Sequence, residues 1–60
     1  MSDYIIEYKL RWVEFSAHER WYVLAPNVET AVKMFRNHFS KNDYEIVEVA
    51  KVIKKDFKNL

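Results

Sequence analysis

The residues of this 60-residue chain that could carry chemistry are two histidines, nine carboxylates and three serines. His18 and His38, with Glu14, Glu19 or Asp43, are of the types that bind a metal ion. A metal site needs ligands that converge. His18 falls in an expected loop, whereas His38 falls in the far half of an expected helix. We therefore predict no metal site, one exposed histidine and one half-buried histidine.

The carboxylates and serines do not form a catalytic pattern. Glu45 and Glu48 should point to opposite sides of a strand, because side chains alternate along it. Glu7 and Glu14 are likewise an odd number of residues apart, so they should not share a face. No motif places a base beside a serine. A layer of this size also has little room for a ligand pocket of about 300 Å³ or more. We predict a protein that is not an enzyme and holds no cofactor.

Basic and aromatic residues suggest a nucleic-acid surface as an alternative function. A sheet that carries both kinds of side chain can stack bases and hold phosphates. Trp12 and Tyr22 are the stacking candidates. The basic candidates are Lys9, Arg11, Lys51, Lys54 and Lys55. The formal net charge is only +1 and three glutamates share the region, so RNA binding is the second hypothesis rather than the first.

The composition limits how so short a chain stays folded. Half of the residues are hydrophobic, 17% are aromatic, and cysteine is absent. A 60-residue domain buries only about 60% of the surface of its unfolded chain, so its stability must come from dense packing or from a partner. Aromatic side chains are frequent in interfaces. We expect a homodimer or a chain that docks on a larger protein.

The sequence also bears on location. No apolar run approaches the 18 or so residues of a membrane-spanning helix. The N-terminal stretch MSDYIIEYK has acidic residues and no basic segment before its apolar residues, unlike a signal peptide. Together with the absence of cysteine, these features predict a cytoplasmic protein that does not contact a membrane.

Apolar residues at helical spacing predict one amphipathic helix over about residues 28–40. Pro26 ends the strand before it, Asn27 is the expected N-cap, and Glu29 suits the positive end of the helix dipole. Asn42 is expected to close the helix in the left-handed conformation that glycine usually adopts. The buried stripe is predicted to contain Val28, Ala31, Val32, Phe35, His38 and Phe39.

Alternating and β-branched residues predict strands over about residues 3–15, 21–25 and 44–53, with residues 54–60 as a tail. In the first strand, the even-numbered residues from Tyr4 to Trp12 should face the helix. In the second strand, the inward residues should be Trp21, Val23 and Ala25. In the third strand, one face should carry Tyr44, Ile46, Ala50 and Val52, and the other should carry Val47, Val49 and Ile53.

Connection rules then fix the topology. The first two strands form an antiparallel hairpin, and a right-handed crossover through the helix makes the second and third strands parallel. The first strand fits between them. We predict a single α+β domain of ββαβ type, with a three-stranded antiparallel-type sheet of order 2-1-3 and the helix on one face.

The other face of this sheet is predicted to be too apolar for water alone. The leading hypothesis is therefore a small homodimeric adaptor or inhibitor that binds protein through that face. Exposed aromatic residues and arginine are the usual anchors of interfaces. The predicted interface residues are Arg11, Tyr22, Leu24, Val47, Val49 and Ile53.

One run of residues carries a resemblance. Every second residue from Trp21 to Ala31, namely Trp21, Val23, Ala25, Asn27, Glu29 and Ala31, resembles the strand-to-helix entry of small phage-encoded proteins of ββαβ type. It is also similar in outline to a small archaeal ribosomal protein of the large subunit, which is far more basic. The likeness covers roughly residues 4–53 in pattern, and it implies the fold without a function.

Overall fold

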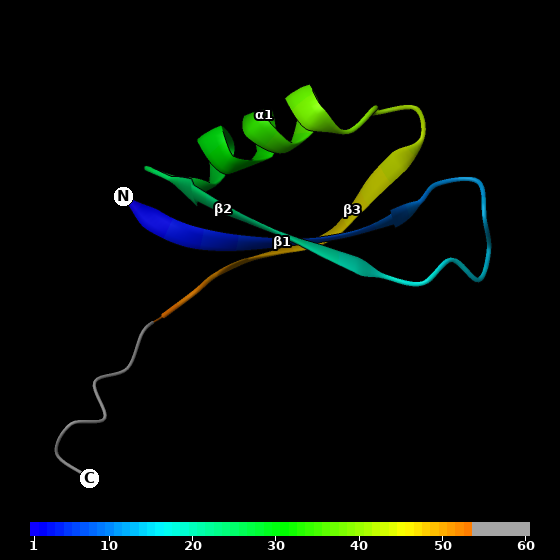
Figure 1. The fold of residues 1–60 in the computed structure, drawn as a ribbon, viewed down its shortest axis with the longest axis horizontal. Helices are drawn as coiled ribbons and strands as arrows, with labels where there is room; N and C mark the ends of the chain where they lie inside the picture. The colour runs from blue at the N-terminus through cyan, green and yellow to red at the C-terminus, as the bar shows by residue number, and fades with distance from the viewer. Residues whose placement is uncertain (54–60) are drawn as a thin grey trace, which may run out of the picture.

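A computed structural model describes residues 1–53, in which a three-stranded sheet is covered on one face by one helix (Figure 1). The central strand β1 is antiparallel to both neighbours, and the strand order is β2-β1-β3. The predicted ββαβ fold and its strand order are confirmed. The elements are β1 (Ser2–Leu10), β2 (Glu19–Ala25), α1 (Val28–His38) and β3 (Tyr44–Lys51).

The core lies between α1 and the sheet. Ile6 of β1 and Phe35 of α1 are fully buried. An aromatic cluster surrounds Phe35, whose ring centroid lies 5.1 Å from that of Tyr8, 5.8 Å from that of Trp21 and 4.6 Å from that of Phe39. Aromatic pairs at these separations stabilise beyond the area that they bury. Dense aromatic packing is thus how this short chain builds a core without disulfides.

The first strand is shorter than predicted. It ends at Leu10 rather than near residue 15, and residues 11–18 form the loop to β2. The loop is held against the turn before β3, because Arg11 N–H donates to the Asp43 carbonyl and the Trp12 indole N–H donates to the Asn42 carbonyl, both at 2.8 Å. Trp12 therefore lies exposed on the loop instead of facing the helix.

The third strand contains a β-bulge that the sequence pattern did not reveal. Tyr8 of β1 pairs with Ile46, whereas the preceding residue Glu7 pairs with Glu48, so Val47 is an extra residue in β3. One extra residue reverses the phase of every side chain that follows it.

The bulge overturns part of the predicted facing of β3. Val49 lies opposite the buried Ile6 and packs against the core, so its predicted outward placement is wrong. Ala50 lies opposite Ile5, whose neighbours on both sides are buried, and so it faces away from the helix. Val52 continues this ladder by donating to the Asp3 carbonyl at 2.8 Å. The predicted inward placement of Ala50 and Val52 is therefore also wrong.

The helix begins as predicted and ends differently. The Asn27 side chain accepts a hydrogen bond of 2.8 Å from Thr30 N–H, which confirms the N-cap. The helix ends at His38, and Phe39 follows in an extended conformation. No residue among 1–53 has a positive φ angle, so the left-handed cap expected at Asn42 is wrong. Ser40 organises the turn instead, since its carbonyl accepts from Asp43 and Tyr44 N–H.

The predicted tail, residues 54–60, lies outside the described residues. Within the described residues, no helix is both long enough and apolar enough to cross a membrane.

Candidate docking face of the sheet

One face of the sheet is not covered by α1 (Figure 1). The cross-strand register divides this face into an apolar end and a charged end. We call it the outer face. It can be followed along β1, because the odd-numbered residues of β1 alternate with the buried Tyr4 and Ile6. Ile5 marks the apolar end and Glu7 marks the beginning of the charged end. The cross-strand partners of these residues complete the face.

The apolar end is built by five side chains from all three strands. Ile5 lies between Tyr22 of β2 and Ala50 of β3, and the next row places Leu24 and Val52 on either side of Asp3. Tyr22 is 65% exposed and Leu24 is 55% exposed. We call Ile5, Tyr22, Leu24, Ala50 and Val52 the outer patch.

The charged end is dominated by carboxylates. Glu7 lies between Arg20 of β2 and Glu48 of β3, and Lys9 forms an ion pair of 3.5 Å with Glu45. Two carboxylates directly opposite one another are unfavourable in a sheet. The side chain of Glu7 also contacts the His18 imidazole. Among residues 1–53, the outer face thus carries more acidic than basic groups.

The predicted interface residues are not all brought together. Tyr22 and Leu24 belong to the outer patch. Val47 is 44% exposed at the bulge, Ile53 is 76% exposed beyond the end of β3, and Val49 lies in the core instead. Reasoning from the sequence missed Ile5, Ala50 and Val52. The outward placement of Ile5 could have been predicted, because it lies between two inward residues. The outward placement of Ala50 and Val52 could not, because it results from the bulge.

Arg11 has a structural role that differs from its predicted role as an anchor. Its guanidinium group donates to the carbonyl of Lys41 at 3.2 Å and to that of Tyr44 at 3.3 Å. Arg36 of α1 donates to the same Tyr44 carbonyl at 3.1 Å. Arg11 therefore ties the loop after β1 to the beginning of β3.

The basic residues proposed for nucleic-acid binding do not converge within the described part of the chain. Lys9 is paired with Glu45 on the outer face, Arg11 is bound to backbone carbonyls, and Lys51 lies opposite the inward residue Tyr4. Lys54 and Lys55 lie outside the described residues. The described sheet therefore offers no continuous basic track for a phosphate backbone.

The two histidines lie apart and take up different contacts. His18 contacts Glu7 on the outer face, whereas the His38 ring lies 5.4 Å from the Trp21 ring on the helix side. Among residues 1–53, no three carboxylate, histidine or cysteine side chains come together in a way that could hold a metal ion.

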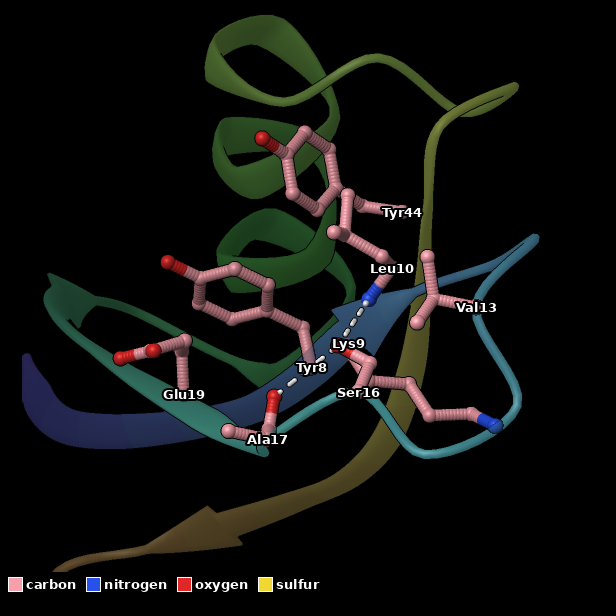
Figure 2. A pocket seen from close by; sticks show the side chains of 8 residues that line it. All are labelled: Tyr8, Lys9, Leu10, Val13, Ser16, Ala17, Glu19 and Tyr44. Atoms are coloured by element: carbon pink, nitrogen blue, oxygen red, sulfur yellow. Dashed lines mark hydrogen bonds between the residues drawn. The ribbon is translucent and has the colours of Figure 1, made fainter.

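A second feature is an open hollow of about 440 Å³ between the end of β1, the following loop and the beginning of β3. The expectation that the layer is too small for such a space is wrong, because the loop projects beyond the core and adds a wall. Figure 2 shows the phenol groups of Tyr8 and Tyr44 on the same side as the Glu19 carboxylate. The lining residues are Tyr8, Lys9, Leu10, Val13, Ser16, Ala17, Glu19 and Tyr44.

The polar groups of this hollow do not form a nucleophile with its base. The Ser16 hydroxyl accepts from Leu10 N–H and donates to the Ala17 carbonyl, each at 3.2 Å, so it shapes the loop (Figure 2). The pKa of the Tyr8 phenol is raised by burial, and further by the Glu19 carboxylate and by Tyr44. Each of these causes disfavours the phenolate.

The raised pKa of Tyr8 predicts a loss of stability in alkaline solution. As the pH rises through about 10, the unfolded chain releases this proton before the folded chain does. The stabilisation that the neutral Tyr8 phenol gives the folded state is therefore fully present below that pH, and it is lost as the pH rises further. We expect the wild type to lose more free energy of unfolding between about pH 9 and about pH 11 than the Tyr8→Phe variant does. Urea unfolding at the two pH values measures the difference, and equal losses would contradict the prediction.

In comparisons with known proteins, no protein-family model, curated protein or solved structure matches this chain.

Proposed function

We propose that this chain is a protein-interaction module, an adaptor or inhibitor that binds a partner protein through the outer patch. The observation that carries the proposal is the outer patch itself, in which Tyr22 and Leu24 are more than half exposed around Ile5. Contiguous exposed apolar side chains are costly in water and mark interaction surfaces. A cytoplasmic location remains part of this proposal.

The shape and placement of the patch support docking by protein. It lies on a sheet whose opposite face packs against α1 (Figure 1), so the backbone that carries the patch is held in place before binding. A rigid surface loses little conformational freedom when a partner binds. An aromatic residue, Tyr22, lies beside aliphatic residues within the patch, as is common at the centre of interfaces.

The charged end indicates the chemistry of the partner. Glu7 and Glu48 occupy the row next to Ile5, and Glu45 lies in the row beyond it. Among the described residues, the basic side chains of these two rows are Arg20 and Lys9. Complementary charge at the rim of an interface guides association and fixes orientation. We infer that the partner presents an apolar strip flanked by basic residues. The same carboxylates disfavour a nucleic acid on this face.

Two lysine substitutions within the patch provide the test. Leu24 and Ala50 are both exposed, so Leu24→Lys and Ala50→Lys should leave the fold intact. The probe is a peptide selected from a random phage-displayed library against the wild type. We expect each substitution to weaken its binding by about thirtyfold or more, as for an interface hot spot.

The matched control is Asn37→Lys, which adds the same charge at an exposed position of α1. It should bind as the wild type does. Unchanged affinity for both patch variants would overturn the proposal. If the wild type bound a single-stranded RNA at low salt, and Lys54→Glu with Lys55→Glu abolished that binding, the RNA alternative would replace it.

A further inference from the structure

The two edges of the sheet differ in how they are protected. Because β1 is central, β2 and β3 each have one edge without a strand beside it among the described residues. Such an edge presents N–H and C=O groups to which another strand can bind. At β3 the edge is interrupted by the bulge at Val47, and the Tyr44 carbonyl already accepts from Arg11 and Arg36.

The edge of β2 lacks these protections. Its pairing with β1 runs without a shift from Ser2 opposite Ala25 to Tyr8 opposite Glu19. Within residues 1–53, no backbone hydrogen bond outside the sheet involves a residue of β2. Its sequence, ERWYVLA, contains no proline, and Pro26 lies just beyond its end. A regular strand with aromatic and branched side chains is well suited to accept a neighbour.

We propose that β2 pairs with β2 of a second copy of this chain, so that two copies form one six-stranded antiparallel sheet. A two-fold axis perpendicular to the sheet makes the two β2 strands antiparallel and keeps both helices on one face. The register must place outer residues opposite outer residues. With Tyr22 opposite Tyr22 of the second copy, Arg20 meets Leu24 and Glu19 meets Ala25. No like charges then lie opposite one another.

The position of α1 fits this arrangement. The His38 ring lies against Trp21 of β2, whereas Arg36 reaches towards β3, so one side of the helix overlooks the β2 edge. Met34, one turn before His38, is on that same side and is 36% exposed.

The spacing of the two helices also fits. Neighbouring strands lie about 4.8 Å apart. A helix centred between β1 and β2 would therefore lie roughly 10 Å from its counterpart across the seam, close to the usual spacing of packed helices. The second copy would thus cover Met34 as well as the strand edge.

This inference does not depend on the proposed function. The outer patch lies on the face of the sheet and remains open when the edges pair, so a dimer of this kind would present two adjoining patches. Dimerisation through the patch itself would instead cover that surface. The two modes are therefore distinguishable by which residues come close together.

The experiment combines solution mass with single cysteines. Light scattering of the wild type at high protein concentration should give twice the 7.3 kDa of the chain. Because the chain has no cysteine, each introduced thiol can pair only with its copy. We expect Tyr22→Cys to form a disulfide-linked dimer roughly tenfold faster than the controls, because Tyr22 lies opposite its own copy and a disulfide needs Cα atoms within about 7 Å. Arg20 and Leu24 lie opposite one another across the seam, so a mixture of the Arg20→Cys and Leu24→Cys proteins should link as fast, whereas neither variant alone should.

The controls are Val47→Cys for the β3 edge and Ile5→Cys for the outer patch. A monomeric wild type would overturn the inference, and so would faster linkage through either control. Hydrogen exchange of the wild type gives a readout without any substitution, because the amides of β2 should become better protected as the protein concentration rises. Protection that does not change with concentration would also count against the inference.

Discussion

Replacing Phe35 with alanine is expected to remove a large part of the free energy of unfolding. Phe35 is fully buried at the centre of the aromatic cluster, in ring contact with Tyr8, Trp21 and Phe39. Removing a buried phenylalanine side chain costs about 3–5 kcal/mol. A chain of 60 residues has a total stability of only about 3–9 kcal/mol. The loss is therefore between about a third and the whole of the stability of the fold.

Circular dichroism during urea unfolding measures this effect. The control is Lys33→Ala, which truncates an exposed side chain of the same helix. Its cost should be below about 1 kcal/mol. A Phe35→Ala protein that unfolds within about 1 kcal/mol of the wild type would show that the core does not depend on this ring.

Placing a carboxylate at Val49 is expected to be almost as damaging. Val49 lies opposite Ile6 and packs against the core, so aspartate at this position would bring an unpaired charge among apolar side chains. We expect a loss of more than about 3 kcal/mol in the free energy of unfolding. If Val49 instead faced outward, as the sequence pattern predicted, the same substitution would leave the fold intact.

Val47→Asp is the matched control for this substitution. Val47 is the extra residue of the bulge and is 44% exposed. The same chemical change there should cost less than about 1 kcal/mol. Chemical unfolding of both variants compares the two positions directly. Equal costs, or a larger cost at Val47, would show that β3 has no bulge at this point.

The fold was predictable because its local signals agree with one another. Period-two alternation identified β1 and β2, and the helical stripe around Ala31 and Phe35 identified α1. The Asn27 cap was read from residue type and position. The strand order then followed from the parallel crossover between β2 and β3, with β1 fitted between them. Each of these signals is local or topological, and none depends on the exact register of β3.

The candidate docking face was only partly predictable. Tyr22 and Leu24 were placed correctly because β2 alternates without interruption. In β3, apolar residues fall at both odd and even positions, so its sequence does not alternate cleanly. The extra residue Val47 therefore could not be located from the sequence. The roles of Arg11 were hidden for a different reason. Its acceptors are carbonyls about 30 residues away, which only the tertiary structure brings close.

The most direct test of the outer patch as a docking surface is a map of amide chemical-shift changes on the wild-type chain. The binder is again a library-selected peptide, added to isotopically labelled protein. We predict that the largest changes fall on Ile5, Tyr22, Leu24 and Ala50, with α1 and the hollow beside Tyr8 little affected. Changes concentrated on α1 or around that hollow, with the outer patch silent, would contradict the proposed function.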